Sequence, residues 1–535
     1  MIKKTVLISL LCLTIIGSTG FVSGNADLFF QITKNLEIFG KLYRELMVSY
    51  VDEVDPSAVV KLGINSMLEG LDPYTVYYDD SNNELELLMS GSYGGIGITV
   101  MQRGNDVVIS NLLDGYSAQK EGIRLGDVIV RVDSAEVNSI KELGKWVKGK
   151  PGTKVKVFIK RENVSDILEF NLTREKVELK NVPVFTTLSN NIGYIQLARF
   201  NKNAANEVKS ALQKLKPEQL NGLILDLRGN PGGRLDEAVD ICKKFLPKNS
   251  LIVSTKGRTD NSKQEYRSDE SPMYPTGKII VLIDSLSASA SEIVAGALQD
   301  HDRATLVGVR SYGKGLVQTI SPIAYNTSLK ITTARYYTPS GRCIQIRDIK
   351  DKSLRISKSD SLSNKTFKTT GGRTVLEADG ITPDIIVKET IVPEIIKELE
   401  YRGLFFEFSA SYAMNHKLTT DFSVTPAIFK EFLQYVEKEN FHQKLDAFEL
   451  LDGLSKELKK DTEFASVVTK LEASKTDFKN GVFSDLKSHK DLISEKLKKE
   501  ILSKQLSEED VFKALSADDR YLKTATDYLT TLVKK

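Results

Sequence analysis

Apolar residues recur at helical spacing near the start of the chain and at alternating positions further on. Ile38, Leu42 and Leu46 fall on one face of a helix, and the spacing around them predicts a helical N-terminal domain over residues 27–88. Short alternating runs separated by glycine-rich turns then predict a mostly-β domain over residues 89–178. The first part of the chain therefore predicts two small domains of different class.

Strand and helix patterns alternate in the next segment, residues 179–390. The runs "GLILDLRGN" and "KIIVLID" are apolar almost throughout, which is typical of strands buried on both faces of a sheet, and amphipathic helices stand between them. This alternation predicts an α/β core. Residues 391–535 carry lysine and glutamate at helical spacing without a catalytic pattern, so we expect a helical C-terminal region with solvated faces.

Residues 1–26 have the pattern of a targeting segment. Lys3 and Lys4 precede a short apolar run, and small residues follow it. A membrane span needs about 20 apolar residues, so this run predicts a secretory signal peptide, with an uncleaved N-terminal anchor as the alternative. Either interpretation predicts an extracytoplasmic, periplasmic protein.

Composition narrows the class further. The chain has 535 residues and a net charge of +3, which predicts several domains and gives no reason to expect nucleic-acid binding. Without the leader, the cysteines that remain are Cys242 and Cys343. Pairing of these two and a pair of buried free thiols both stay open.

The stretch "DSLSASASEIVAGALQD", residues 284–300, gathers four serines before a helical pattern. Ser289 falls between a predicted strand and a helix N-terminus, where its hydroxyl would be exposed and the Ala290 N–H would point toward a developing oxyanion. Helix capping by Ser287, Ser289 or Ser291 is the plainer explanation of this stretch taken alone. A nucleophilic serine also needs a group that takes its proton.

Histidine is a poor candidate for that base. His301 lies twelve residues after Ser289, at the far end of the same helix and about 18 Å away by helical rise. The other histidines, at positions 416, 442 and 489, belong to the charged C-terminal region. Lys314, in "GVRSYGKGLVQT", is the alternative, although lowering a lysine pKa from about 10.4 to about 8 requires roughly 3.3 kcal/mol.

Gln318 lies four residues after Lys314 and could orient its neutral amine. On a straight strand four residues span about 13 Å, so the pairing requires the chain to curl near Gly313 or Gly315. The same segment partly matches a phosphate-binding loop, but Gly315 stands where the magnesium-binding hydroxyl is needed. An exposed loop lysine remains the plain alternative for Lys314.

Two motif sets resemble known families. The mostly-β domain contains "EGIRLGDVIVRVDS" and resembles a PDZ domain. That resemblance implies that the backbone of Gly95, Ile96, Gly97 and Ile98 binds the carboxylate of a peptide C-terminus by β-augmentation. A plain tight turn is the alternative for these glycines.

The core resembles the carboxy-terminal processing (tail-specific) protease family. The motifs "LDLRGNPGG", "SASASE", "GKGLVQ", "YYTPSGRCIQ" and "GITPD" occur in that order, with a lysine 25 residues after the central serine. The resemblance implies a ClpP/crotonase-like α/β core with no cofactor or metal. It also implies the following site: Ser289 as nucleophile, Lys314 as general base, Gln318 as its orienting residue, and backbone oxyanion donors among Ala290, Gly232 and Gly233.

Together these patterns predict an extracytoplasmic serine endopeptidase that cleaves proteins near their C-termini. Its partners would be proteins or peptides with free, apolar C-termini, with membrane attachment through an uncleaved leader and a homodimer as further expectations. A catalytically silent PDZ scaffold and a histidine-assisted serine hydrolase are the competing hypotheses.

Overall fold

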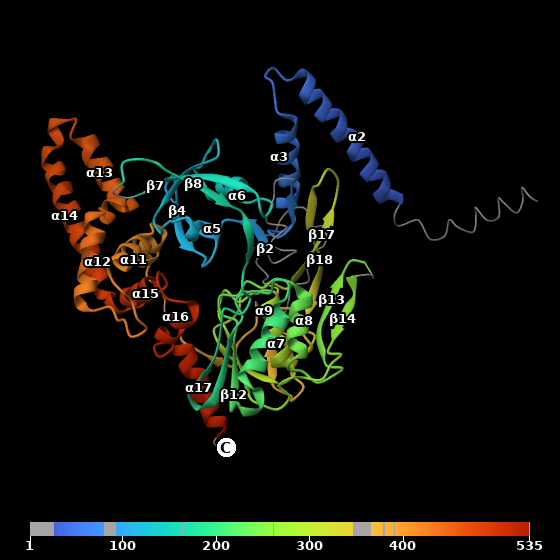
Figure 1. Ribbon diagram of the computed structural model, residues 1–535. Coiled ribbons are helices and arrows are strands. Elements are labelled where there is room, and N and C mark those ends of the chain that lie inside the picture. The colour runs from blue at the N-terminus through green and yellow to red at the C-terminus, as the bar shows by residue number, and fades with distance from the viewer. Residues whose placement is uncertain are drawn as a thin grey trace, which may run out of the picture. The chain divides into compact units, whose positions relative to one another are not determined.

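The computed structural model describes residues 26–79, 92–161, 164–259, 262–345, 365–377, 380–389 and 391–533 (Figure 1). The predicted leader therefore lies outside the described residues, apart from Ala26. Among the helices within these ranges, none combines the length and the apolar character that crossing a membrane requires.

The N-terminal unit is helical, as its pattern predicts. It contains helix α2 (Ala26–Ser49) and helix α3 (Pro56–Glu69), and the short strand β1 (Val76–Tyr78) follows. The Asp55 side chain accepts the Ser57 N–H and caps α3. Several apolar side chains of α2 are exposed, among them Leu36 at 66% and Leu42 at 63%.

The mostly-β domain is a twisted antiparallel sheet with two short helices. Its sheet runs in the order β3-β4-β5-β7-β8, β6 pairs with β5, and β2 pairs with β9. Alternate residues of the strands, such as Val107, Ile109 and Ile129, form its buried core. The elements are β2 (Ser92–Gly95), β3 (Ile98–Arg103), β4 (Asp106–Leu112), α5 (Ser117–Lys120), β5 (Val128–Val132), β6 (Ala135–Glu136), α6 (Ile140–Val147), β7 (Lys154–Lys160), β8 (Leu168–Thr173) and β9 (Glu175–Glu178).

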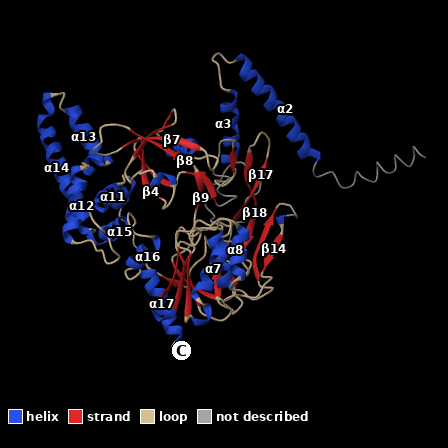
Figure 2. Ribbon diagram, viewed as in Figure 1, coloured by secondary structure: helices blue, strands red, loops and turns tan. Residues whose placement is uncertain are grey.

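The α/β core is built on a sheet of order β10-β11-β12-β15-β16-β21. All its pairs are parallel except the edge pair β10–β11. Its strands are β10 (Val184–Leu188), β11 (Ile192–Gln196), β12 (Gly222–Asp226), β15 (Ile279–Ile283), β16 (Ala304–Gly308) and β21 (Ile385–Ile386), and its helices are α7 (Ala204–Leu215), α8 (Leu235–Lys243) and α9 (Ala290–Asp300). Figure 2 shows strands of the core in red close to the helices α7 and α8 in blue. The strand–helix alternation predicted from the sequence is present here.

Further strands of the core pair outside this sheet. Strands β13 (Leu251–Gly257) and β18 (Ser328–Tyr337) are neighbours, with β14 (Gln264–Arg267) beside β13 and β17 (Leu316–Pro322) beside β18. A small hairpin joins β19 (Thr366–Lys368) to β20 (Thr374–Leu376).

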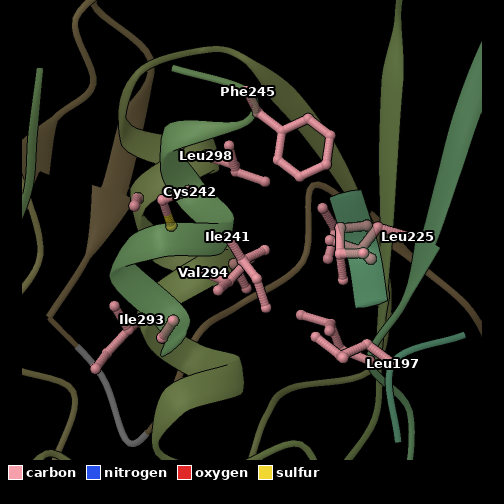
Figure 3. Close-up of a cluster of buried hydrophobic side chains, with 14 of the residues drawn as sticks. Leu197, Leu225, Ile241, Cys242, Phe245, Ile293, Val294 and Leu298 are labelled. Carbon is pink, nitrogen blue, oxygen red and sulfur yellow. The ribbon is translucent and has the colours of Figure 1, made fainter. Parts of the chain in front are cut away.

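Helices cover both faces of the parallel sheet. On one face α7, α8 and α9 pack on the strands, and Figure 3 shows Val294 and Leu298 of α9 beside Ile241 of α8, facing Leu225 of β12. On the other face Leu522, Ala525 and Leu529 of helix α17 (Arg520–Val533) pack against the strands, on the side that holds Ile224, Ile280 and Leu282. The end of the described chain thus encloses this second face of the sheet.

The rest of the C-terminal region has a core of its own. Phe405, Phe408, Phe432, Leu486 and Leu497 are buried together. The helices are α10 (Glu394–Tyr401), α11 (Leu404–Asn415), α12 (Pro426–Lys438), α13 (Asp446–Leu458), α14 (Ala465–Ser488), α15 (Lys490–Leu502) and α16 (Glu508–Leu515). The predicted boundary at residue 390 groups α17 with these helices, whereas its apolar face packs on the α/β core.

Candidate active site

Ser289 lies at the junction of strand β15 and helix α9. Its backbone has φ +56° and ψ −111°, and the first residue of α9 follows it directly. A non-glycine residue with positive φ is uncommon and costs conformational free energy, so the surrounding contacts must hold this turn in place. Ser289 is half-buried, which leaves it accessible to a substrate.

The neighbouring serines have structural roles. The buried Ser287 Oγ lies 2.9 Å from the Leu227 carbonyl and accepts the Asp284 N–H at 2.9 Å. The buried Ser291 Oγ donates to the Asn230 carbonyl at 2.9 Å. These two hydroxyls tie the turn to the segment after β12. Neither of them caps α9, whose N-cap residue is Ser289 itself, so the capping alternative applies to the same serine that is the candidate nucleophile.

Glu292 connects the serine turn to the lysine loop, and sequence reasoning missed it. Its Oε2 accepts the N–H of Ser289 at 2.8 Å and that of Lys314 at 2.9 Å. Its Oε1 accepts the Gly313 N–H at 2.7 Å and the Ser311 hydroxyl at 2.6 Å. The available signal was the Ser-x-x-Glu spacing of a capping box, which explains only the contact with Ser289.

Burial of the Glu292 carboxyl raises its pKa above the ordinary glutamate value, because the charged form loses its hydration. The hydrogen bonds from Ser311, Lys314, Gly313 and Ser289 act in the opposite direction, since they stabilise the carboxylate. All four partners donate, so the ionised form satisfies every contact while a protonated carboxyl would oppose one of them.

Tyr336 makes a second link between the same two segments. Its hydroxyl lies 3.1 Å from the Ser289 carbonyl and 2.5 Å from the Lys314 carbonyl, within donating distance of both. Its own N–H donates to the Gly315 carbonyl at 3.0 Å. The backbones of Ser289 and Lys314 are thus held together by a carboxylate on their N–H groups and a hydroxyl on their carbonyls.

Gln318 belongs to β17, where the register against β18 shifts between Val317 and Gln318. Its Nε2 donates to Thr332 Oγ1 at 3.3 Å. The predicted curl is present in part, because Gly313 has φ +89° and the strand begins only at Leu316. The orientation of the Lys314 amine by Gln318 stays a prediction.

The turn that contains Gly232 and Gly233 packs closely against Ser289. A Cβ added to Gly232, whose φ is +96°, would come within 2.9 Å of Ser289 Cβ and of the Ala290 N, so only glycine fits. The Gly232 N–H donates to Asn230 Oδ1 at 2.9 Å. That bond counts against Gly232 as an oxyanion donor and favours Ala290 and Gly233 among the predicted candidates.

His301 caps the opposite end of α9 from Ser289, and its Nε2 lies 2.6 Å from the Leu251 carbonyl. His416, His442 and His489 fall in the C-terminal helical region. Within the described ranges, no group of three or more His, Cys, Asp or Glu side chains could hold a metal ion.

Both predicted cysteines are free and buried thiols. Burial raises the pKa of Cys242 and of Cys343, which lowers their reactivity. The motif around Cys343 has a structural role: Arg342 forms a buried ion pair with Asp300 at 2.7 Å, which joins the loop after β18 to the end of α9.

In the mostly-β domain, Gly95 ends β2 and Ile98 begins β3. The Ile96 and Gly97 carbonyls accept N–H groups from Ala118 and Leu113. Because Leu113 bonds to Gly97, Ile98 and Leu112 form a non-hydrogen-bonded pair, and the Ile98 N–H points away from β4. Among the strands that the structure describes, none pairs with this edge of β3, which we call the open edge; it lies near helix α6, which suits the addition of a peptide strand.

Three family descriptions match the chain. Residues 94–172 match "PDZ domain", residues 191–352 match "Peptidase family S41", and residues 395–529 match "Probable PDZ-protease, C-terminal helical domain". The third match covers the region for which the sequence pattern indicated only charged helices.

Named relatives agree with these descriptions. The chain is 37% identical over 319 residues to the "Carboxy-terminal-processing protease" of Bartonella bacilliformis, covering 58% of this chain and 73% of that protein. It is 31% identical over 345 residues to the "Carboxy-terminal processing protease CtpA" of Bacillus subtilis, covering 62% and 72%. Among solved structures, "Photosystem II D1 C-terminal processing protease" is 26% identical and covers 66% of this chain and 93% of that one, with a TM-score of 0.38.

Proposed function

The chain belongs to the carboxy-terminal-processing family of PDZ serine proteases, and from that membership we propose that Ser289 is its nucleophile and Lys314 its general base. The observation that carries this assignment is the Glu292 carboxylate. It accepts the N–H groups of both residues and so brings the two halves of a dyad to one point of the fold.

In the proposed reaction, Lys314 Nζ takes the proton of Ser289 Oγ as the oxygen attacks the scissile carbonyl carbon. The oxyanion that forms accepts hydrogen bonds from the N–H groups of Ala290 and Gly233. Lys314 then gives its proton to the leaving amine, and an acyl-enzyme remains on Ser289. Water, deprotonated by the same lysine, attacks the acyl carbon. The ester bond to Ser289 then breaks, Lys314 returns the proton to Ser289 Oγ, and the second product leaves as a carboxylate. Gln318 orients the amine between the two steps.

Two alternatives are less well supported. A histidine-assisted hydrolase needs an imidazole at Ser289, but His301 occupies the other end of an eleven-residue helix. A catalytically silent scaffold has no need to hold a serine at positive φ against a lysine loop. The mixed sheet with helices on both faces supports the ClpP/crotonase-like core that the resemblance implies.

The PDZ domain is proposed to present the substrate by its tail. The Ile98 N–H at the open edge of β3 would bind the terminal carboxylate together with its neighbours Gly95, Ile96 and Gly97. The half-exposed Ile140 and Trp146 of α6, 42% and 47% exposed, favour apolar residues near that terminus.

The location that we propose for the protein rests on the sequence of residues 1–26, nearly all of which lie outside the described structure. The charged and apolar leader supports export to the periplasm as a cleaved signal peptide or an anchor. The exposed apolar side chains of α2 support a homodimer contact.

The test is cleavage of a peptide with a free apolar C-terminus, with covalent labelling of the protein by a fluorophosphonate. We expect wild-type protein to cleave the peptide and to carry the label on Ser289, and the Ser289→Ala variant to do neither. Unchanged cleavage by Ser289→Ala would exclude the assignment.

A further inference from the structure

A carboxylate near the end of the described chain reaches the segment that supports the nucleophile. Arg228 follows strand β12 in the motif "LDLRGNPGG", and its guanidinium lies between two carboxylates. Nε and Nη2 donate to Asp226, while Nη1 and Nη2 donate to Asp519 at 3.0 and 2.7 Å. Arg228 and Asp519 lie 291 residues apart in the sequence.

This ion pair is shielded from water. The Arg228 side chain is 20% exposed, that of Asp519 is 22% exposed, and that of Asp226 is 2% exposed. Asp226 also accepts the Tyr194 hydroxyl at 2.8 Å, and the Tyr521 ring lies 5.1 Å from the guanidinium carbon. Bidentate pairs in such surroundings fix the plane of an arginine side chain far better than a solvated contact does.

The segment that Arg228 belongs to carries the turn of Ser289. The Leu227 carbonyl accepts the Ser287 hydroxyl, and the Gly229 N–H donates to Asp284. The Asn230 carbonyl accepts both the Ala288 N–H and the Ser291 hydroxyl. Each of these contacts is made by a residue within two positions of Arg228. Together they fix the chain both before and after Ser289 in the sequence.

Asp519 also holds the last helix in place. Its Oδ1 accepts the N–H groups of Tyr521 and Leu522 and so caps α17, whose Leu522, Ala525 and Leu529 are buried against the sheet. The carboxylate therefore joins a helix that covers the second face of the sheet to the support of the nucleophile.

Building on the proposed function, we propose that Asp519 is a positioning residue for Ser289: it fixes the Arg228 guanidinium, and through it the 227–230 segment on which the serine turn rests. The C-terminal helical region would then be a component of the active site and not only a scaffold. Asp519 does not touch the substrate, so it should affect the reactivity of Ser289 and leave substrate affinity unchanged.

The variant Asp519→Asn tests this without removing α17. Asparagine is as good a helix cap as aspartate, so the cap on the Tyr521 N–H is retained. The negative charge that pairs with the Arg228 guanidinium is lost. Deleting α17 would instead expose the apolar face of the sheet and unfold the core. The matched control is Asp518→Asn, because Asp518 pairs with Lys498 at the surface and is 68% exposed.

For the full-length Asp519→Asn protein we expect kcat to fall about tenfold with KM within twofold of wild type. The rate at which a fluorophosphonate labels Ser289 should fall by the same factor, and Asp518→Asn should change neither rate. A labelling rate and kcat within twofold of wild type, whatever the melting temperature, would show that Asp519 serves stability alone and would overturn the proposal.

A second variant guards against a purely structural loss. Arg228→Lys keeps the positive charge but loses the forked geometry of the guanidinium. A protein that carries both Arg228→Lys and Asp519→Asn should lose no more activity than the more damaged of the two single variants, because both substitutions act on one contact. Additive losses would overturn the proposal. Failure of the wild-type enzyme to be labelled at Ser289 would overturn both this inference and the proposed dyad, whereas labelling that is equal in all variants would overturn this inference alone.

Discussion

The Lys314 N–H donates to the Glu292 carboxylate at 2.9 Å, and the same oxygen accepts the N–H of Ser289 at 2.8 Å. One buried carboxylate thus sets the separation of the two residues that the proposed mechanism requires to exchange a proton. A general base must lie within hydrogen-bond reach of the proton it takes, so the chemistry depends on this contact as much as on the dyad itself.

Loss of either member of the proposed dyad should abolish turnover. Ser289→Ala and Lys314→Ala should each lower kcat by several orders of magnitude, since the two act as one unit. Gln318→Ala should cost less, because Gln318 orients the amine and accepts no proton. Cleavage of a C-terminally free peptide, followed by mass spectrometry, measures all three.

His301→Ala is the control for the dyad experiment, because the imidazole lies at the other end of α9 and should be dispensable for chemistry. Retention of more than about a tenth of the wild-type rate by Lys314→Ala would exclude lysine as the base.

The variant Glu292→Gln should be damaged in both folding and activity. The amide nitrogen of the introduced side chain would oppose two of the four donors, and each buried donor left without an acceptor costs about 1–3 kcal/mol. We expect the free energy of unfolding to fall by about 2–6 kcal/mol and kcat to fall at least tenfold, as measured by urea denaturation and peptide cleavage.

Glu265→Gln is the matched control, since Glu265 is 58% exposed and its pair with Arg267 lies at the surface. Exposed ion pairs contribute about 0–1 kcal/mol, so this variant should retain wild-type stability and activity. An equal loss in the two variants would contradict the role assigned to Glu292.

The pH dependence should show two separate effects. A lysine base must be deprotonated, so kcat/KM should rise through about pH 7 to 9. With a histidine base the rise would be centred at a pH of about 6.5. At acid pH, protonation of Glu292 removes one acceptor from the lysine loop. Because burial raises the pKa of Glu292, this loss should begin at a higher pH than an ordinary glutamate would give.

Rates measured from about pH 4 to 10 separate the two effects. The variant Glu292→Gln should abolish the pH dependence at acid pH and keep the rise through about pH 7 to 9. A rise of kcat/KM centred at about pH 6.5 would indicate a histidine base instead.

The PDZ domain should distinguish a free C-terminus from an amidated one. Hydrogen bonds to a charged acceptor are worth roughly 1.5–3 kcal/mol, so the loss of one from the N–H groups around Ile98 predicts an affinity about tenfold to a hundredfold lower. Isothermal titration of matched acid and amide peptides into the Ser289→Ala protein measures this without consuming them. Equal affinities would refute recognition of the terminal carboxylate.

The local pattern of the sequence was sufficient to predict the class of each segment and the buried strands of the parallel sheet. The runs around Ile224 and Ile280 predicted buried strands because a strand enclosed on both faces has no polar side to show. Ser289 was indicated because a serine between a strand and a helix is a local feature. The dyad itself came from resemblance to a family, since spacing alone left Lys314 as a loop lysine.

The contacts that assemble the site were decided only by the tertiary structure. Glu292 looks like a local capping residue in the sequence, because nothing nearby shows that its carboxylate also accepts the N–H of Lys314. Asp519 looks like one more charge in a solvated helical region, yet it pairs with Arg228 across 291 residues. Burial and partner choice depend on which distant segments meet, and a periodic pattern records only which face of each segment is apolar.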